Sequence, residues 1–322
     1  MTPLTGRRAL ITGGLGFLGG ALARALVAEG VDVLIVDALV PGSGGTYRNI
    51  AGIEDSVRVV EADVRDAELL PALLEGRDLV FNLAGLRSHS DSMTNPHADL
   101  EMNCAAQLTL LEACRRMTPP PTVVYAGTRQ IYGRPQYLPV DVNGVHKAAA
   151  EQYHFIYSRV YGIPVTTLRL TNTYGPGMRV RDARQTFLGV WLQAVVRDQE
   201  FEVWGDGEQV RDFTYVDDAV AAFLLVAGDE RAHGRAFNLG DQHPISLRHL
   251  ADVLVAANGG GSYRVVPFPA DRQPIDIGDY AGDYRAIREL LGWRPTVTLE
   301  DGLARTLGFY REHGSHYWED DA

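Results

Sequence analysis

The stretch "PVDVNGVHKAAAEQYH", residues 139–154, places an asparagine and a lysine at the start of a predicted helix. Asn143 and Lys147 are four residues apart, so their side chains lie on one face of that helix. A lysine ammonium supplies a positive field to a nearby ligand or base. An asparagine amide cannot act as a base, although it is well suited to cap a helix that begins at Gly144. If this helix serves proton transfer, another residue must carry the proton.

Three side chains are candidates for that transfer. His146 adjoins Lys147, and His89 lies in "GLRSHSDSM", after the fourth predicted strand. An imidazole changes its charge near neutral pH, which suits a general base. Tyr132 follows the predicted strand that ends at Thr128. A structural role is the alternative for each histidine.

The motif "ITGGLGFLGGALA" indicates a site for a dinucleotide. Gly13, Gly16 and Gly19 follow a predicted strand and open an amphipathic helix, so the backbone can approach a pyrophosphate at the helix N-terminus. Asp37 ends the next predicted strand, where a carboxylate bonds a ribose diol and repels a 2′-phosphate. The motif and the acid together predict NAD rather than NADP.

Short β-branched runs alternate with helical stretches up to about residue 172, which predicts a parallel sheet with helices on both faces. The predicted fold is α/β, a doubly wound Rossmann sheet. Beyond residue 172 the alternation changes, and we expect a smaller lobe over the carboxyl edge of the sheet. The predicted division is a Rossmann domain at 1–172, to which segments near 212–240 return, and a second lobe at 173–322.

Composition excludes several other classes of protein. The 322 residues carry a net charge of −11, and no run of Lys or Arg is interleaved with aromatic residues, so we expect no nucleic-acid surface. The longest apolar run, near "AVAAFLLVAG", is too short to cross a bilayer, and no basic and apolar leader opens the chain. Cys104 and Cys114 cannot frame a disulfide scaffold. We therefore expect a cytoplasmic protein without membrane segments, and we predict no metal site.

Motifs along nearly the whole chain, from Ala9 to about Tyr310, resemble one family. They are the glycine motif, "EADVRD", "FNLAG", "VVYAGTRQIYG", "LRLTNTYGPG", "WGDGEQVRDFTYVDDAV", "FNLGDQHPISLRHLA" and "LLGWRPTVTLEDGL". Together they resemble the extended short-chain dehydrogenase/reductases that act on nucleoside diphosphate sugars. The resemblance implies a Rossmann domain with tightly held NAD and a C-terminal lobe that grips a nucleotide sugar.

The resemblance also implies roles for particular residues. Asp63 and Val64 would flank the adenine, Lys147 would hold the nicotinamide ribose, and Thr128 would bond the reacting sugar hydroxyl. The implied cofactor contacts are Gly13, Gly16, Phe17, Leu18, Gly19, Asp37, Asp63, Val64, Leu83, Ala84, Gly85, Asn103 and Lys147. The implied substrate contacts are Arg129, Asn172, Val203, Arg211 and Arg272. The candidate catalytic residues are Thr128, Lys147, Asn143 and His89.

The diphosphate contacts have alternatives. Arg211 can fork two hydrogen bonds onto a diphosphate, or it can form a surface ion pair with Asp212 or Glu208. Asn172 can serve the ligand or cap a loop. The family usually carries another arginine where this chain has Gln273, with Arg272 beside it, so a phosphate contact by Arg272 is left open.

The chain departs from the family at three places. Asn143 replaces a tyrosine that normally accepts the proton of the reacting hydroxyl. Arg129 and Gln130 replace the Asp-Glu pair that follows the threonine in dehydratases, which disfavours elimination of water. The connection at 134–142 is roughly ten residues shorter than in relatives, because the loop is short or because a segment is absent.

The predicted function is an NAD-dependent epimerase that acts on a nucleoside diphosphate sugar through a transient 4-keto intermediate. A reductase, a dehydratase, a decarboxylase and a catalytically silent binding protein are the alternatives. Helices near 99–117 and 145–161 carry apolar residues on more than one face, which predicts burial against a second copy. The resemblance implies that these helices form a four-helix homodimer interface.

Overall fold

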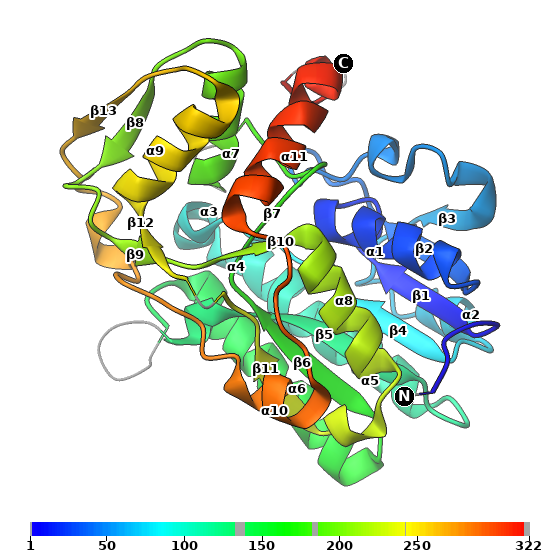
Figure 1. Cartoon of the computed structure of the whole chain (residues 1–322). Helices are drawn as coiled ribbons and strands as arrows, with labels where there is room; N and C mark the ends of the chain where they lie inside the picture. Colours follow the sequence, from blue (N-terminus) through cyan, green and yellow to red (C-terminus); the bar gives the residue numbers. More distant parts are fainter. Residues whose placement is uncertain (1, 133–138, 182–185, 242, 319–322) are drawn as a thin grey trace.

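The computed structural model describes residues 2–132, 139–181, 186–241 and 243–318. A parallel sheet of seven strands lies at its centre (Figure 1), in the order β11-β6-β5-β4-β1-β2-β3. The strands are β1 (Arg8–Thr12), β2 (Asp32–Asp37), β3 (Val57–Glu61), β4 (Leu79–Asn82), β5 (Thr122–Thr128), β6 (Val165–Leu170) and β11 (Arg235–Asn238). Strands such as β2 and β4 are buried along almost their whole length, because helices cover both faces of the sheet. The predicted doubly wound α/β fold is confirmed.

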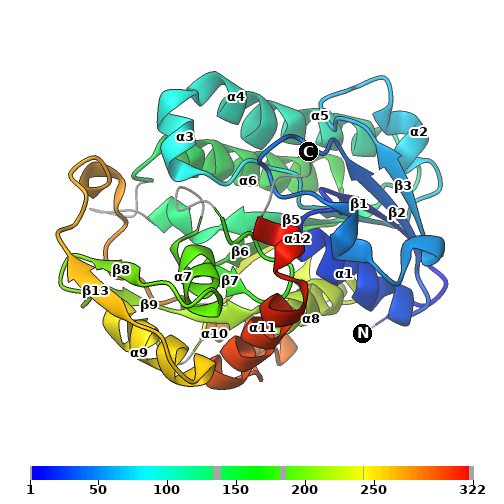
Figure 2. The same cartoon turned by 90° about the horizontal axis from the view of Figure 1, so that it is seen from above.

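One face of the sheet is covered by helices from the first half of the chain. Figure 2 shows them above the sheet, with α1 and α8 below it. They are α2 (Leu70–Leu74), α3 (His89–Thr94), α4 (Pro96–Leu100), α5 (Ala106–Arg115) and α6 (Val142–Tyr161). The single helix predicted near 99–117 is interrupted by a π-helical segment, Glu101–Ala105, between α4 and α5. The core of this face contains side chains such as Leu74, Leu110 and Tyr157.

The other face is covered by α1 (Phe17–Ala28) and α8 (Val216–Ala227), which pack against each other. Their buried side chains join one core with those of the C-terminal lobe. The lobe contains α7 (Phe187–Val196), α9 (Leu247–Asn258), α10 (Arg285–Leu291), α11 (Leu299–His313) and α12 (Ser315–Trp318). Strand β11 comes late in the sequence, yet it pairs in parallel with β6 of the large sheet.

Short strand pairs complete the lobe. They are β7 (Asn172–Tyr174) with β10 (Phe213–Tyr215), β8 (Phe201–Trp204) with β13 (Tyr263–Val266), and β9 (Val210–Arg211) with β12 (Ile245–Ser246). Aromatic rings pack between these elements: the ring centroids of Trp191 and Phe201 are 4.9 Å apart. The first pair follows directly from the end of β6, so it joins the lobe to the carboxyl edge of the sheet.

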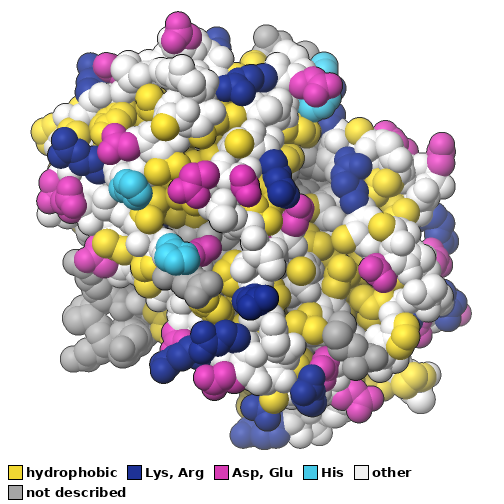
Figure 3. All heavy atoms as spheres, in the orientation of Figure 1, with side chains coloured by type: hydrophobic (Ala, Val, Ile, Leu, Met, Phe, Trp, Pro, Cys, Tyr) yellow, Lys and Arg dark blue, Asp and Glu magenta, His cyan; other side chains and the backbone are white. Residues whose placement is uncertain are grey.

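The outer surface shows no large patch of one charge on the face in Figure 3, where basic and acidic side chains are interspersed. Cys104 and Cys114 are both buried and unpaired. None of the helices in the described ranges combines the length and the apolar character that crossing a bilayer requires. Most of the shortened connection predicted at 134–142 lies outside the described residues, which resume at residue 139.

Candidate active site

A cavity of about 840 Å³ lies at the carboxyl ends of the central strands, between the sheet and the C-terminal lobe. Its wall brings together nearly all the residues that the sequence singled out. These are Gly13, Gly16, Phe17, Leu18, Gly19, Asp37, Asp63, Val64, Leu83, Ala84, Gly85, His89, Thr128, Arg129, Asn143, Lys147, Asn172, Arg211 and Arg272. Asn103 and Val203 are not on the wall, and neither are His146 and Tyr132.

The glycine loop has the shape that a pyrophosphate requires. Gly13 has φ +69°, a left-handed conformation that favours glycine, and a Cβ there would lie 3.0 Å from Cα of Ala84. A Cβ on Gly19 would clash with the carbonyl oxygen of Gly13. Gly16 is the N-cap of α1 and provides no side-chain cap, so the first amides of the helix are open to an anion. The residues present therefore fit a dinucleotide.

Asp37 ends β2 beside this loop. Its Oδ2 accepts a hydrogen bond of 3.0 Å from the Leu15 amide, and its Oδ1 accepts one of 2.9 Å from the Leu39 amide. Burial raises the pKa of Asp37, and these two hydrogen bonds oppose the rise. Asp63 differs, because its carboxylate forms an ion pair of 2.6 Å with Arg65, which lowers the pKa of Asp63. The Asp37 carboxylate is thus held in place at the end where the adenosine ribose would lie.

Lys147 is buried at the opposite end of the cavity. Burial lowers its pKa to about 8; the Arg87 guanidinium acts in the same direction and Asp99 opposes it. A Cβ on Gly85 would lie 3.0 Å from Nζ of Lys147 and 2.7 Å from Oδ1 of Asn103, so only glycine permits this approach. The Asn103 side chain accepts from the Leu86 amide and donates to the Leu86 carbonyl, both at 3.0 Å. Asn103 therefore holds the loop beside the cavity instead of lining it.

Asn143 does not cap α6, so that prediction was wrong. The helix begins two residues earlier than predicted, at Val142, and its N-cap is Asp141, whose Oδ1 accepts a hydrogen bond of 2.6 Å from the Gly144 amide. The side chain of Asn143 instead turns inward and donates from Nδ2 to the Leu86 carbonyl and to Oδ2 of Asp99, both at 2.9 Å. Both amide hydrogens are thus used, and no donor among the described residues bonds Oδ1 of Asn143.

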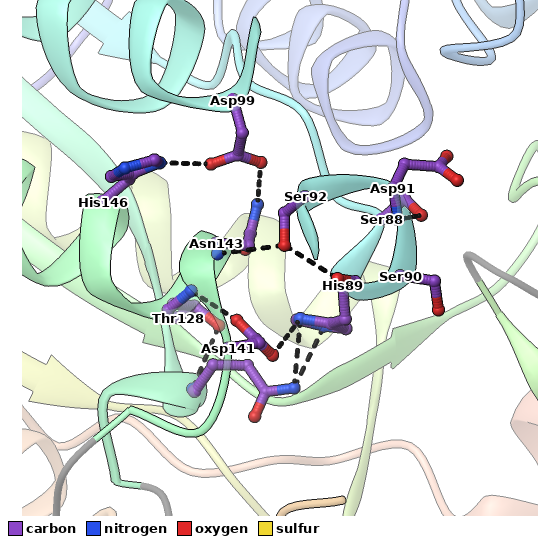
Figure 4. A network of polar contacts seen from close by, with 12 residues as sticks. Ser88, His89, Ser90, Asp91, Ser92, Asp99, Thr128, Asp141, Asn143 and His146 are labelled. Atoms are coloured by element: carbon purple, nitrogen blue, oxygen red, sulfur yellow. Dashed lines mark hydrogen bonds and ion pairs between the residues drawn. The ribbon is translucent and has the colours of Figure 1, made fainter. Parts of the chain in front are cut away.

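His146 and Tyr132 are engaged elsewhere. Nδ1 of His146 lies 2.8 Å from Oδ1 of Asp99, while the other oxygen of that carboxylate faces Asn143 (Figure 4). The Tyr132 hydroxyl donates to Oδ1 of Asn238 at 3.0 Å. Neither side chain is placed to take a proton from a ligand in the cavity.

His89 does line the cavity. Figure 4 shows its ring beside Asp141, and Nδ1 of His89 lies 2.8 Å from Oδ2 of Asp141. Nε2 of Gln130 lies 3.0 Å from Nε2 and 3.4 Å from Nδ1 of the same ring. The His89 side chain is 33% exposed, whereas the Asp141 side chain is completely buried. The backbone N–H of Gln130 donates to Oγ1 of Thr128 at 3.2 Å, so Gln130 links the histidine to the end of β5.

Arg129 and Asn172 lie together on the lobe side of the cavity. Nη2 of Arg129 donates to Oδ1 of Asn172 at 3.0 Å, and its guanidinium lies 5.2 Å from the centre of the Tyr280 ring. Burial, and then the Arg211 guanidinium, lower the pKa of Arg129 to about 10. Nη1 of Arg129 is buried and has no partner among the described residues. An anionic ligand would satisfy this group.

Arg211 is buried, and it does not form the surface ion pair with Asp212 or Glu208 that the sequence left open. Its Nη2 lies 3.3 Å from Oδ1 of Asp276. Asp212 bonds Oγ1 of Thr171 and the Gly282 amide instead. Asn172 belongs to β7 and donates to the Asp212 carbonyl at 2.9 Å, so it does not cap a loop.

The two remaining substrate candidates differ in position. Arg272 lines the cavity and donates from Nη1 to Oγ of Ser90 on α3, so it connects the lobe to the helix that carries His89. Val203 is fully buried in the core on β8, and its side chain does not reach the cavity wall. Its implied role as a substrate contact is not supported by this position.

Sequence reasoning missed several residues of the site. Arg87 lines the cavity and donates to the Ser43 carbonyl at 2.5 Å, and Arg179 lowers its pKa in addition to burial. Asp99 accepts a hydrogen bond from the Asn143 side chain, and Asp141 forms an ion pair with His89. The aspartate of "PVDVNG" stands before the predicted helix, where Asp is a preferred N-cap, and this signal could have identified Asp141. Nothing in the local sequence marks Asp99 or Arg179.

Comparison with known proteins agrees with this geometry. The model of the NAD dependent epimerase/dehydratase family matches residues 9–240. The chain belongs to that family. It is 30% identical to a UDP-glucose 4-epimerase of Mycolicibacterium smegmatis, over 94% of this chain and 98% of the relative.

Two further relatives show the range of activities in the family. A UDP-N-acetyl-alpha-D-glucosaminuronate decarboxylase of Bacillus cytotoxicus is 29% identical, over 95% of this chain and 98% of the relative. The solved structure of a UDP-glucose 4-epimerase from Thermotoga maritima with UDP-glucose is 28% identical, with a TM-score of 0.85 over 95% of this chain and 99% of that one. The family and its dependence on NAD are therefore as the sequence predicted.

Proposed function

We propose that this protein is an NAD-dependent epimerase that acts on a nucleoside diphosphate sugar through a transient 4-keto intermediate. The observation that carries the proposal is the presence of Thr128 and Lys147 on the wall of one cavity that also contains the glycine loop. Burial lowers the pKa of Lys147 to about 8, which means that its charged form is destabilised in this position. Such a lysine does not stabilise the fold. A ligand that bonds the ammonium explains why it is kept.

The residues of the chain divide the work as follows. Lys147 bonds the nicotinamide ribose, and its charge raises the electrophilicity of the bound cofactor. Thr128 offers a hydroxyl, already within 3.2 Å of the Gln130 amide, that orients the reacting sugar hydroxyl. NAD, when bound, accepts a hydride from the sugar carbon and returns it. Epimerisation then requires only that the keto sugar presents its other face before the hydride comes back.

The arginines support an anionic nucleotide as the substrate. Arg129 offers a buried N–H without a protein partner, and Arg211 lies near enough to lower the pKa of Arg129. Two desolvated cations beside Asn172 suit a diphosphate, which can accept several charge-assisted hydrogen bonds. The relatives named above act on UDP sugars, and we propose that uridine is the nucleoside here as well.

The other activities of the family fit less well. The two residues after Thr128 are Arg129 and Gln130, and neither side chain can protonate a leaving hydroxyl as an acid does. This disfavours a dehydratase that uses the usual pair. A silent protein that binds NAD would also use Lys147 to hold the ribose, and reduction of the bound cofactor distinguishes it from an enzyme. A decarboxylase and a reductase are distinguished by their products.

The proposal includes the assembly and the division of the chain. Residues 1–172, with the segments near 212–240, bind NAD, and the rest of 173–322 binds the nucleotide sugar. Val145, Ile156, Val160 and Tyr161 leave exposed apolar side chains on α6. Burial of this surface in a homodimer would remove it from water. We propose a cytoplasmic location, since the two cysteines are unpaired and buried.

The test is a panel of UDP-, dTDP-, GDP- and ADP-hexoses with the purified protein. Each sugar is added at saturation, the absorbance of reduced cofactor is followed, and the products are separated by chromatography. The proposal predicts a transient reduced cofactor and an epimeric sugar nucleotide of unchanged mass for at least one sugar. Loss of water would assign a dehydratase, and loss of CO₂ from a UDP-hexuronic acid added to the panel would assign a decarboxylase. Oxidation of added NADH in the presence of a 4-keto sugar nucleotide would assign a reductase. Binding without reduction for the whole panel would indicate a silent protein.

A further inference from the structure

We propose that His89, positioned by Asp141, takes the proton of the reacting sugar hydroxyl and returns it. This inference rests on the proposed function and adds the proton-transfer group that Asn143 cannot provide. It assigns to Asp141 a second role, since the same carboxylate also caps α6.

The other candidates are already committed. Both amide hydrogens of Asn143 are donated, and an amide oxygen is too weak a base to hold a proton. His146 is paired with Asp99 outside the cavity wall. Lys147 is needed in its charged form, because its ammonium group is proposed to bond the nicotinamide ribose. His89 is the imidazole that lines the cavity among the described residues.

Asp141 fixes the position of the histidine ring. Its Oδ1 is held by the Gly144 amide at 2.6 Å, so the orientation of the carboxylate follows the first turn of α6. Its Oδ2 is buried and lies 2.8 Å from Nδ1 of His89, a separation that suits an ion pair, and it receives no hydrogen bond from the described residues. A buried carboxylate oxygen with one polar neighbour depends on that neighbour for compensation. The ring is therefore tied to the helix that carries Asn143 and Lys147.

The partners determine which nitrogen is free to react. A carboxylate only accepts hydrogen bonds, and Oδ2 of Asp141 is the nearer neighbour of Nδ1, at 2.8 Å against 3.4 Å for Nε2 of Gln130, so we assign the ring hydrogen to Nδ1. Nε2 then keeps its lone pair, which accepts from the amide nitrogen of Gln130 at 3.0 Å until a sugar hydroxyl takes the place of that donor. The third of the side chain that is exposed leaves the ring accessible to a sugar beside Thr128. This arrangement has the order carboxylate, imidazole, hydroxyl that activates alcohols elsewhere.

The step balances with groups already named. The O–H bond of the sugar hydroxyl breaks and its proton goes to Nε2 of His89, while the C–H bond electrons leave with the hydrogen to the nicotinamide of NAD. A C=O bond forms at that carbon. In the return step the carbon receives the hydride on its other face, and Nε2 gives the proton back to the oxygen. Asp141 stays ionised and stabilises the imidazolium between the two steps.

Charged groups from several elements surround His89. Asp141 faces it from the start of α6, Asp91 lies on its own helix, and Arg272 reaches Ser90 from the C-terminal lobe. Among the described residues, the cations on the same cavity wall are Lys147, Arg87, Arg129, Arg179, Arg211, Arg264 and Arg272. Protonation of the imidazole at low pH blocks the step, so the forward rate should fall on the acid side.

The test compares His89→Ala and Asp141→Asn with the wild-type protein and with His97→Ala, an exposed histidine on α4 outside the cavity wall. The readouts are the single-turnover reduction of bound NAD on adding the sugar nucleotide that the panel identifies, the Kd of that sugar nucleotide and of NAD, and the pH profile. We expect His89→Ala to slow reduction about 100-fold or more with both Kd values within threefold of wild type. Added imidazole should restore part of the rate, and His97→Ala should behave as wild type.

Asp141→Asn separates positioning from capping. An asparagine oxygen still accepts from the Gly144 amide, so thermal stability should be close to that of the wild type. Its amide group faces Nδ1 of His89 as a donor, which favours the other tautomer of the ring. We expect at least a tenfold slower reduction and a changed acid limb of the pH profile. If the wild type reduces bound NAD and His89→Ala does so at the same rate, the inference about His89 is wrong. If the wild type itself does not reduce bound NAD, the proposed function is wrong instead.

Discussion

Asn143 donates an amide hydrogen to Asp99, with 2.9 Å between Nδ2 and Oδ2. Its second amide hydrogen goes to the Leu86 carbonyl, and both acceptors lack a hydrogen to give. The orientation of the amide is therefore fixed by its partners. A buried hydrogen-bond donor to the protein stands where the family resemblance leads one to expect a phenol.

This relationship makes a charge at position 143 costly. In Asn143→Asp a second carboxylate would lie beside Asp99 in a buried site, and like charges at this distance raise the pKa of one of them strongly. We expect a loss of about 3 kcal/mol in the free energy of unfolding at pH 7, more than Asn143→Ala loses. The difference between the two variants should shrink at pH 5, where the acid of higher pKa is protonated and can donate. Urea denaturation of both variants at the two pH values measures it, and an equal difference at both would contradict the geometry.

Lys147 should make stability depend on alkaline pH. The unfolded lysine keeps its proton up to its ordinary pKa of 10.5, while the folded one releases it near 8. Between these values the unfolded state binds more protons, so the folded state without cofactor gains stability as the pH rises. Lys147→Met should remove this dependence and raise stability at pH 7 by up to about 3 kcal/mol. It should also abolish turnover and weaken NAD retention. Parallel curves for both proteins from pH 7.5 to 10 would exclude this burial.

Cofactor preference should follow Asp37. The carboxylate is fixed by the amides of Leu15 and Leu39, so it cannot turn away from a 2′-phosphate. We expect NAD to bind at least 100-fold more tightly than NADP, since a charge of the same sign at short range costs several kcal/mol. Asp37→Ser should narrow this ratio and destabilise the loop by about 1 kcal/mol, because amides lose their acceptor. Calorimetric titration with both dinucleotides provides the measurement, and similar affinities for the wild type would refute it.

Arg129 should act on the nucleotide sugar and not on NAD. Its free Nη1 gains a partner only when the anionic substrate binds, so Arg129→Ala should raise KM for the sugar nucleotide about tenfold or more. The Kd of NAD should stay within twofold. Arg285→Ala removes an exposed arginine that pairs with Asp283, and it serves as the matched control. A loss of NAD affinity in Arg129→Ala would place this arginine in the cofactor site instead.

The homodimer should depend on α6. Val160 is 57% exposed and lies one turn from Ile156 on the same helix face. Val160→Asp should convert a dimer to a monomer at micromolar concentration, as measured by light scattering. Val265→Asp changes a valine that is 45% exposed on β13 of the lobe, and it should remain dimeric. A wild-type protein that is monomeric would remove the α6 surface from consideration as a dimer interface.

The sequence by itself determined the fold class and the dinucleotide loop, and most of the site residues that it predicted line the cavity. Glycines with fixed spacing and an acid at a strand end, here Gly13 to Gly19 and Asp37, are local signals, because the chemistry depends on neighbours in the chain. The alternation of strand and helix places the ends of the strands at one edge, which brings Thr128 and Lys147 to the same cavity. These features required no knowledge of distant contacts.

Only the tertiary structure decided what Asn143, His89 and Arg211 do. Asn143 has the local signal of a cap, yet Asp99, 44 positions away, takes its amide, and Asp141 is the cap instead. His89 and Asp141 meet across 52 positions, and Arg211 meets Asp276 across 65. Hydrogen bonds and ion pairs depend on separations of a few ångströms, and the packing of whole elements sets these separations. The partner of a polar side chain is therefore a property of the folded chain and not of its local sequence.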